Sequence, residues 1–460
     1  MLLPASFQER AAAIVGGPFI VFDRASLDRY GADALKQSFP PDLVALPGNA
    51  AEISRLVQLC SELAVPMVVR GGGTGYTGGA VPIRGGLVIS LERLNRILEI
   101  DQVNLLARVQ PNVITGDLQD AVEAVGLFYP PDPASLRQSA IGGNVAECAG
   151  GPRAFKYGTT KRYVLALEAV LPTGEIIRTG SKTVKNVVGY DLTQLLVGSE
   201  GTLAILTEIT LRLVPKPASQ RALCAAFADI KAAVDAVTKL IQLRVIPAAI
   251  ELMDRDSLDA LRAHLGVSLA PVGAEAALLV EVDGDPAAVA AEIALVEKAC
   301  AASATHVRRA DTEEQREELW RLRREISPAL LRIAPVKLNN DIVVPRGRVP
   351  ELFALVEKIR QQSGLPIACF GHAGDGNIHV NIMVPDDKAE SRAKDAVRAL
   401  FEGVVALEGS ITGEHGVGYT KAPFLSLELS AETIALMKRV KAAFDPRGLL
   451  NPGKIFPDGQ

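Results

Sequence analysis

Along the first half of the chain, short apolar runs alternate with amphipathic stretches. The amphipathic stretches predict helices at Ala50–Leu63 and near Thr115–Val125, with one or two more before Phe39. This mixture of strands and helices, separated by many glycine turns, indicates an α+β domain. The apolar runs predict strands at Leu43–Leu46, Pro66–Arg70, Gly86–Leu91, Leu105–Gln110, Val164–Leu171 and Leu203–Val214.

The second half repeats the mixture with longer, alanine-rich helices. They alternate with strands such as Leu278–Asp283, Ile367–Phe370 and Ile378–Val384, so we expect a second domain in which helices cover a sheet. The prolines of Leu213–Pro217 stop a strand and stiffen a linker, which places a domain boundary there. The predicted helices are Lys231–Gln242, Pro286–Ala301, Asp311–Ser327, Pro350–Ser363 and Ala431–Phe444.

These signals divide the chain into a helical segment over residues 1–40, domains over 41–217 and 218–410, and a C-terminal segment over 411–460. The 460 residues are 48% hydrophobic and 22% charged, which is typical of a globular protein. A net charge of −4 argues against a nucleic-acid partner. No apolar run approaches the ~18 residues of a transmembrane segment, and the N-terminus has no secretion signal, so we expect a cytoplasmic protein.

The cysteines restrict the redox chemistry that the chain can perform by itself. Five cysteines are scattered without a CxxC pair, which argues against a disulfide framework. The same spacing argues against a cysteine-held zinc site or an iron–sulfur cluster. Electrons that pass through this protein must therefore use another cofactor.

A glycine-rich loop follows the predicted strand that ends at Arg70. It contains a GxGxxG pattern from Gly73 to Gly78, which in nicotinamide-binding proteins opens a helix that holds the pyrophosphate. The following residues, Ala80–Gly86, include a proline and two glycines and disfavour such a helix, which argues against a nicotinamide dehydrogenase. Consecutive glycines can instead direct backbone N–H groups at phosphate oxygens, although a simple surface turn is the alternative.

Two more glycine clusters follow, Pro131–Gly151 and Gly198–Leu203. The order and spacing of the three clusters over residues 40–215 resemble the FAD-binding domain of the vanillyl-alcohol-oxidase-like (PCMH-type) flavoproteins. Members that attach FAD covalently often carry His where this chain has Thr74, so the resemblance implies a non-covalent flavin. It implies an FAD site formed by Arg70, Gly71, Gly72, Gly73, Thr74, Gly75, Pro131, Asp132, Ser135, Ser139, Gly142, Gly143, Asn144, Gly150, Tyr157, Gly158, Glu200, Gly201, Ile205 and Asn451.

Three of the five histidines lie in two short glycine-rich segments. The apolar runs on either side of Gly371–Asn377 predict a hairpin in which His379 and Asn381 share a face and His372 can fold back toward His379. Two imidazoles on one face suit a divalent metal, and Glu414 would complete a His₂–carboxylate set. One such histidine alone is more often a hydrogen-bonded side chain of a sheet, but the clustering favours a functional site.

The segments Gly371–Val384, Gly413–Gly418 and Asn451–Lys454 resemble the C-terminal part of the FAD-dependent D-2-hydroxyacid dehydrogenases. This family includes the glycolate oxidase catalytic subunit, D-lactate dehydrogenase and D-2-hydroxyglutarate dehydrogenase. The resemblance implies an α+β fold: a PCMH-type FAD-binding domain, a helix-covered antiparallel-sheet substrate domain, and a C-terminal segment that returns to the FAD domain and completes the active site. It also implies zinc or manganese bound by His372, His379 and Glu414.

The resemblance further implies the residues that bind and activate the substrate. The family places an Arg on the substrate carboxylate and a hydroxyl residue four positions later, which match Arg323 and Ser327. We expect Pro328 to end or kink their helix just beyond Ser327, and at least one arginine among residues 321–324 to be a solvated charge. His415 is the implied catalytic base. The implied substrate-binding residues are Arg323, Ser327, Lys337, Asn381 and His415.

Together these residues predict oxidation of a D-2-hydroxy acid to a 2-oxo acid, with His415 taking the hydroxyl proton and flavin N5 taking the hydride. Glycolate, D-lactate and D-2-hydroxyglutarate all stay candidates for the substrate. The electron acceptor would be a quinone, an electron-transfer flavoprotein, a cytochrome or an iron–sulfur subunit, the last in a multi-subunit complex of the glycolate oxidase type. Such a partner could hold the protein at a membrane surface. An oxidase that uses O₂, a non-catalytic flavin subunit and a homo-oligomer stay open as alternatives.

The residue at position 74 predicts how the flavin is held. The purified protein should be yellow and should release all its flavin on acid precipitation, because Thr74 has no imidazole for a covalent bond. The measurement is the flavin absorbance of the supernatant and of the pellet. Flavin that stays with the precipitated protein would contradict this prediction.

Overall fold

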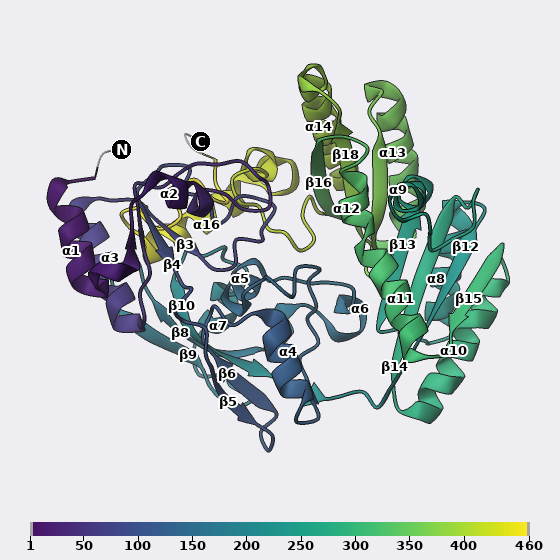
Figure 1. Ribbon diagram of the computed structural model, residues 1–460, viewed down its shortest axis with the longest axis horizontal. Helices are drawn as coiled ribbons and strands as arrows, with labels where there is room; N and C mark the ends of the chain where they lie inside the picture. Colours follow the sequence, from purple (N-terminus) through teal and green to yellow (C-terminus); the bar gives the residue numbers. More distant parts are fainter. Residues whose placement is uncertain (1–2, 458–460) are drawn as a thin grey trace. The chain divides into compact units, whose positions relative to one another are not determined.

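The computed structural model describes residues 3–457 and divides into two compact units (Figure 1). Unit 1 combines the described residues of Met1–Ala149, Thr159–Lys216 and Glu414–Gln460, and unit 2 combines Gly150–Gly158 and Pro217–Gly413. Residues 150–158 thus group with unit 2, whereas the sequence analysis assigned them to the domain over 41–217. Residues 411–413 also group with unit 2 rather than with the C-terminal segment.

Unit 1 contains a small sheet in the order β1-β2-β4-β3, whose last three strands are parallel. The side chains of these three strands point into buried surroundings on both faces, which explains their continuous apolar sequences. Helices α1 and α3 pack on this sheet through residues such as Phe7 and Leu56. The elements are α1 (Ala5–Val15), η1 (Gly17–Phe19), β1 (Ile20–Val21), α2 (Arg24–Tyr30), β2 (Leu43–Ala45), α3 (Ala50–Leu63), β3 (Met67–Arg70) and β4 (Leu87–Ser90).

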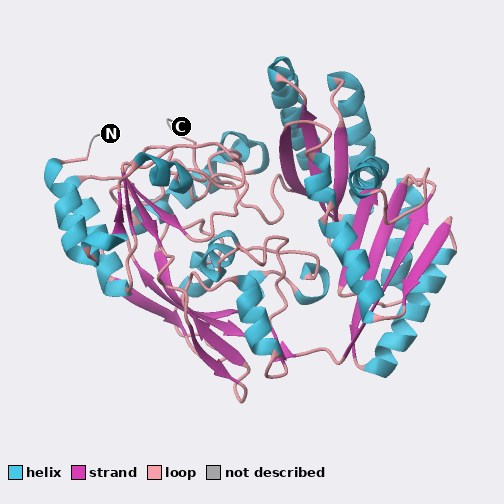
Figure 2. Cartoon of the chain, in the orientation of Figure 1, coloured by secondary structure: helices cyan, strands magenta, loops and turns pink. Residues whose placement is uncertain are grey.

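A second, antiparallel sheet of unit 1 has the order β5-β6-β10-β8-β9 (Figure 2). The segment from Glu414 onward returns to unit 1, where Leu450 forms a parallel bridge with Met67 of β3. The elements are β5 (Ile97–Asp101), β6 (Leu106–Val109), α4 (Thr115–Glu123), β7 (Leu127–Phe128), α5 (Ile141–Glu147), η2 (Thr160–Arg162), β8 (Val164–Val170), β9 (Ile176–Gly180), α7 (Leu192–Leu196), β10 (Ile205–Arg212), β11 (Val214–Pro215), η5 (Ala422–Phe424), α15 (Leu425–Glu428) and α16 (Ala431–Phe444).

Unit 2 is a helix-covered antiparallel sheet, as the sequence predicts, in the strand order β15-β12-β14-β13-β17-β18-β16. Helices α9, α11 and α12 share one apolar core with the sheet, and α8 and α10 contact β12 and β14. No helix among residues 3–457 is both long enough and apolar enough to cross a membrane. The strands are β12 (Ser219–Phe227), β13 (Ala249–Asp254), β14 (Ala276–Gly284), β15 (His306–Ala310), β16 (Val336–Val343), β17 (Ile367–His372) and β18 (Asn377–Val384). The helices are α6 (Ala154–Tyr157), α8 (Ile230–Gln242), α9 (Arg255–Leu265), α10 (Pro286–Ala301), α11 (Glu313–Arg324), α12 (Ile326–Leu330), η3 (Arg346–Arg348), α13 (Val349–Ser363), η4 (Asp387–Ala389) and α14 (Glu390–Ala406).

The helix predicted over Asp311–Ser327 is two helices, and this part of the sequence prediction is wrong. Helix α11 ends at Arg324 and α12 begins at Ile326, so the break lies before Ser327 rather than just beyond it. Pro328 explains the break, because its ring crowds the carbonyl group four residues earlier, which belongs to Arg324. Arg323 and Ser327 therefore lie on two consecutive helices rather than on one helical face.

A buried ion pair fixes α11 on the sheet. Arg316 Nη1 lies 2.7 Å from Glu281 Oε2 on β14, and the same oxygen accepts a 2.6 Å hydrogen bond from the Trp320 indole. Both charged side chains are at least nine-tenths buried. Because Arg323 follows on the same helix, this pair also sets the position of Arg323.

Replacing Arg316 by Met should lower the free energy of unfolding by about 3–5 kcal/mol, because it leaves the buried carboxylate of Glu281 without its cation. The matched control is Arg308→Met, which removes a half-exposed ion pair with Glu318 and should cost less than about 1 kcal/mol. Urea unfolding of both variants checks the prediction. Equal losses in the two variants would contradict it.

Candidate functional site

The glycine-rich loop of unit 1 starts where β3 ends. Residues 79–86 form turns and no helix, as expected from Pro82, so the loop lacks the geometry of a nicotinamide-binding motif. Within the described part of the chain, the backbone N–H groups of residues 72–77 donate no hydrogen bond to protein. Such a run of unused donors in a loop with positive φ at Gly73 fits the binding of phosphate oxygens.

The second glycine cluster packs directly against this loop. A Cβ atom at Gly72 would lie 2.6 Å from the Gln138 carbonyl oxygen, and one at Gly71 would lie 3.4 Å from the Cβ of Ala140. The following residues form α5, a short helix that the sequence analysis missed. A Cβ at Gly143 on this helix would meet no protein atom within 4 Å. This helix therefore leaves an open side at Gly143, next to the loop.

Several of the residues expected to bind flavin direct their side chains into the protein. The side chains of Ser139 and Asn144 contact Thr115 at 3.0 and 2.6 Å, and Ile205 is buried in the core. Arg70 reaches across Gly73 to the Ala32 carbonyl oxygen. Contacts of these residues with a flavin would therefore come mainly from their backbone atoms.

The third cluster is joined to the loop by Asn451. Its Oδ1 accepts a 3.0 Å hydrogen bond from Val69 N, and its Nδ2 donates to the Glu200 carbonyl oxygen at 2.9 Å. A Cβ at Gly201 would lie 2.8 Å from the same amide group. The structure thus brings together the expected flavin residues of the loop, of 139–144, and of 200, 201 and 451.

Other expected flavin residues belong to two further segments. Pro131, Asp132 and Ser135 follow β7, and Pro131 is held by Gln119, whose side-chain amide donates to its carbonyl oxygen at 2.9 Å. Gly150, Tyr157 and Gly158 belong to the segment that groups with unit 2. There the Tyr157 hydroxyl donates a 2.7 Å hydrogen bond to the carboxylate of Asp283.

The turn that carries Glu414 and His415 belongs to unit 1 and contacts the glycine loop. The imidazole of His415 stacks on the Tyr76 ring, with centroids 5.2 Å apart and planes 27° apart. Its carbonyl oxygen accepts a 3.1 Å hydrogen bond from Thr77 Oγ1. The candidate base is therefore held against the loop expected to bind the flavin pyrophosphate.

In unit 2, β17 and β18 form the predicted hairpin. His372 and His379 are buried, and their rings meet edge to face with centroids 5.3 Å apart. The backbone register explains this contact, because His379 pairs with Phe370 and His372 lies two residues further along the same face. The two imidazoles expected to bind metal are thus side by side.

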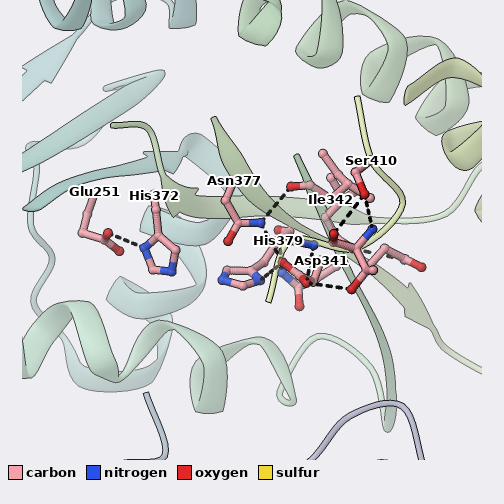
Figure 3. Close-up of polar contacts among 12 residues, drawn as sticks. Glu251, Asp341, Ile342, His372, Asn377, His379 and Ser410 are labelled. Atoms are coloured by element: carbon pink, nitrogen blue, oxygen red, sulfur yellow. Dashed lines mark hydrogen bonds and ion pairs between the residues drawn. The ribbon is translucent and has the colours of Figure 1, made fainter. Parts of the chain in front are cut away.

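Glu251 on β13 is a central residue of this site that the sequence analysis missed (Figure 3). Its carboxylate lies 2.5 Å from His372 Nδ1 and 2.6 Å from Arg323 Nη2. Burial alone would raise the pKa of Glu251, but its contacts with His372 and Arg323 hold it below the ordinary glutamate value. A carboxylate on Nδ1 leaves Nε2 of His372 as the nitrogen that can bind a metal.

Asp341 on β16 has the corresponding position beside His379, its partner in the backbone register. Its Oδ1 lies 3.7 Å from His379 Nδ1 and accepts a 2.6 Å hydrogen bond from Asn377 (Figure 3). Its Oδ2 accepts a hydrogen bond from the backbone N–H of Gly413, the residue before Glu414. Both histidines thus have a buried carboxylate near Nδ1, the outer arrangement typical of metal-binding imidazoles.

The expected substrate residues of unit 2 lie on the same face of the sheet. Arg323 is buried, with its guanidinium 4.6 Å from the Phe370 ring centre, whereas Arg321 and Arg324 are exposed charges, as expected. Lys337 lies in β16, and its ammonium group donates a 2.6 Å hydrogen bond to Ser327 Oγ. The structure therefore pairs these two residues, although the sequence did not predict this pairing.

The buried polar atoms on this face that have no hydrogen-bond partner among the described residues include Arg323 Nε, a donor, and Asn381 Oδ1, an acceptor. A buried polar group without a hydrogen bond costs about 1–3 kcal/mol. Such groups are typical of binding sites, where a ligand supplies the missing hydrogen bond. The face can therefore take a ligand that carries both an anionic group and a hydrogen-bond donor.

Comparison with known proteins gives the same functional class. Residues 216–455 match the family described as "FAD linked oxidases, C-terminal domain", and residues 41–180 match "FAD binding domain". A "Glycolate oxidase subunit GlcD" of Bacillus subtilis is 45% identical over 95% of this chain and 94% of its own length. A "D-lactate dehydrogenase" of Anaerostipes hadrus is 35% identical, covering 92% and 93%, and a "D-2-hydroxyglutarate dehydrogenase" of Stutzerimonas stutzeri is 34% identical, covering 98% and 99%.

Solved structures with low sequence identity share the fold. A p-cresol methylhydroxylase structure superimposes with a TM-score of 0.83 at 17% identity, covering 100% of this chain and 99% of that one. A 4-ethylphenol oxidase of Gulosibacter chungangensis gives 0.80 at 18% identity, covering 100% and 99%. At this identity the likeness concerns the fold alone, and it confirms the expected PCMH-type architecture.

The open space beside Gly143 on α5 predicts that an added methyl group there would interfere with flavin binding. Gly143→Ala should lower the flavin content of the purified protein, because the new Cβ meets no protein atom but points into the space beside the loop. Without flavin, the variant should have a free energy of unfolding about 0.5–1 kcal/mol higher than that of the flavin-free parent, since Ala has a higher helix propensity than Gly. Flavin absorbance and thermal unfolding measure the two effects. Gly17→Ala, at an exposed and equally open position, is the control, and full flavin content in both variants would contradict the prediction.

Proposed function

Because the chain belongs to the family of FAD-linked oxidases, we propose that it is an FAD- and metal-dependent dehydrogenase that oxidises a D-2-hydroxy acid to the 2-oxo acid. The names of its relatives support glycolate, D-lactate or D-2-hydroxyglutarate as the substrate. The observation that carries the proposal is the series Arg323–Glu251–His372 beside His379, in which one buried carboxylate holds both a carboxylate-binding cation and a candidate metal ligand.

The flavin would be held without a covalent bond by the unused N–H groups of residues 72–77, by the open side of α5 at Gly143, and by the backbone near Asn451. When bound, FAD supplies the acceptor for the hydrogen and the two electrons that leave the substrate carbon. Oxidation of the hydroxy acid also needs a base for the hydroxyl proton, and His415, on the turn that contacts the glycine loop, is the candidate for that task.

A zinc or manganese ion would be held by the Nε2 atoms of His372 and His379 together with the carboxylate of Glu414. The carboxylates of Glu251 and Asp341 near the two Nδ1 atoms support this donor set. Gly413, whose N–H donates to Asp341, is joined directly to Glu414. When bound, such an ion supplies a positive charge that favours loss of the hydroxyl proton of the substrate.

Arg323 would bind the substrate carboxylate. Its Nη2 is occupied by Glu251, while its Nε has no acceptor in the described residues and is available for a carboxylate oxygen. Arg323 is also stacked near Phe370, which limits its rotation and so fixes the orientation of the bound acid. Lys337 and Ser327 add a second polar pair on this face, and Asn381 Oδ1 would accept a hydrogen bond from the substrate.

His415 would take the proton of the substrate hydroxyl group. Its ring is oriented by Tyr76 and its backbone by Thr77, so the imidazole is presented in a fixed direction. With the proton on His415, the electron pair left on the oxygen would form the C=O bond, and the Cα hydrogen would leave with both electrons of its C–H bond for the flavin. Arg323 and His415 thus have separate tasks, binding and proton transfer.

A second candidate is the catalytic FAD subunit of a multi-subunit complex of the glycolate oxidase type. The name of the 45% identical relative, a "subunit", supports this alternative. Without a cysteine cluster of its own, the chain would pass electrons to an iron–sulfur partner, a quinone, a cytochrome or an electron-transfer flavoprotein. The oxidation of the hydroxy acid would be the same in both cases.

The roles of Glu414 and His415 can be separated by two substitutions. Glu414→Gln should lower the metal content, because a ligand loses its charge, and added metal should restore part of the rate. His415→Asn should keep both metal and FAD but slow flavin reduction by ~10²–10⁴-fold, the range for loss of a general base. Stopped-flow flavin reduction with D- and L-hydroxy acids, together with metal analysis, tests both effects.

His306→Asn is the control for a general loss of imidazole, since His306 is exposed at the edge of unit 2, and its rate should match the parent. If His415→Asn loses the metal while Glu414→Gln keeps it, the two roles are exchanged. If no D-2-hydroxy acid reduces the flavin of the parent protein, the proposed function is wrong.

A further inference from the structure

One buried side chain of unit 1 holds the backbone of the turn that carries His415. Glu200 Oε1 accepts a 2.7 Å hydrogen bond from Val417 N, and Oε2 accepts a 2.6 Å hydrogen bond from Gly418 N. The Glu200 residue is 6% exposed. Two short bonds from consecutive amides to one carboxylate are strong and fix both distance and direction.

The backbone of Glu200 is itself held on both sides. Its N–H donates to the Ala146 carbonyl oxygen at 2.8 Å, and its carbonyl oxygen accepts from Asn451 Nδ2 at 2.9 Å. Its φ angle is +51°, a conformation that costs a glutamate of the order of 1–3 kcal/mol. Strain of this kind persists only where the surrounding contacts demand it, and here they place the carboxylate opposite the turn.

The turn has little room to move away from this position. A Cβ at Gly416 would lie 2.2 Å from Glu147 Oε2 and 3.0 Å from Glu200 Oε1. A Cβ at Gly418 would lie 2.0 Å from the Thr77 carbonyl oxygen, and both glycines have positive φ. The turn is therefore packed between the carboxylates on one side and the glycine loop on the other.

The second carboxyl group, Glu147, differs from Glu200 in its partners. Its Oε2 is buried and accepts no hydrogen bond from the described residues. Burial and the neighbouring Glu200 raise the pKa of Glu147 well above the ordinary glutamate value. Burial also raises the pKa of Glu200, but the Val417 and Gly418 amides oppose that rise. The Val417 and Gly418 amides therefore favour the negative charge of the pair on Glu200, while burial beside Glu200 favours the protonated form of Glu147.

From this geometry we infer that Glu200 is a positioning residue: its carboxylate, held by Val417 N and Gly418 N, sets the place of the His415 imidazole. This inference rests on the proposed function, because it assumes that His415 is the catalytic base. It gives the Glu200 side chain a task other than flavin binding, and a contact of Glu200 with flavin would involve its backbone.

Glu200→Gln tests the inference, because the amide side chain can accept only one of the two hydrogen bonds and turns its NH₂ group toward the other N–H. The rate of flavin reduction at saturating substrate should fall by ~10–100-fold, the range for a slightly misplaced catalytic group. KM should change by less than about threefold, because Arg323 binds the substrate, and FAD should stay bound. Amide hydrogen exchange of residues 415–420 should become faster, a readout that does not depend on turnover.

The matched control is Glu147→Gln on the other side of Gly416. A glutamine resembles a protonated glutamate in size and charge, so this variant should reduce its flavin within about twofold of the parent rate. Unchanged hydrogen exchange in Glu200→Gln, or an equal loss of rate in the two variants, would overturn the inference.

The double variant separates positioning from a general effect on folding. A residue that acts only through His415 has no further effect once that imidazole is absent, so Glu200→Gln/His415→Asn should be as slow as His415→Asn alone. Rate losses that multiply would overturn the inference while leaving His415 as the base. A His415→Asn variant with the parent rate would instead overturn the proposed function.

Discussion

The carboxylate of Glu251 is the interaction on which the arrangement of unit 2 depends. Its side chain has no exposed surface, and an isolated charge at such a depth costs several kcal/mol unless cations and hydrogen bonds compensate it. Arg323 and His372 supply that compensation from two different elements, α11 and β17. One oxygen of Glu251 contacts Arg323 and the other contacts His372. If either partner moved away, part of the carboxylate charge would be left uncompensated in the buried interior. The positions of Arg323 and of the His372 imidazole, the proposed substrate-binding and metal-binding groups, are thus set together.

Local sequence signals predicted the elements whose ends are fixed locally. Helices α3, α10 and α16 have the predicted bounds because capping residues, Asn49, Asp285 and Ser430, lie directly before them. Strands such as β5 and β9 were missed, since β5 lies at a sheet edge with half-buried side chains and β9 is largely exposed. Helix α5 was missed because two glycines lower its intrinsic propensity, and tertiary contacts, such as those with Thr115 and Pro111, stabilise it.

The candidate site was predictable where chemistry and position coincide in a short motif, as in the histidine hairpin. Glu251 and Asp341 were not predicted, because their partners lie far away in the sequence: His372 is 121 residues from Glu251. A signal was nevertheless present for Glu251, since it is an acid within an apolar strand, a position that requires a buried cation or donor. The side-chain partners of Glu200 were equally hidden, because Val417 lies 217 residues further along the chain.

The route of the chain through unit 1 has a consequence for its biosynthesis. Asn451 ties Val69 to Glu200, yet the ribosome must complete all of Pro217–Gly413 before Asn451 leaves the exit tunnel. The small parallel sheet and the glycine loop therefore lack Asn451 while Pro217–Gly413 is being translated. A gene cut at the boundary after Lys216 would yield a fragment that has the glycine clusters but neither the bridge nor the turn that Glu200 holds. The bridge through Asn451 thus forms only after Pro217–Gly413 has been translated.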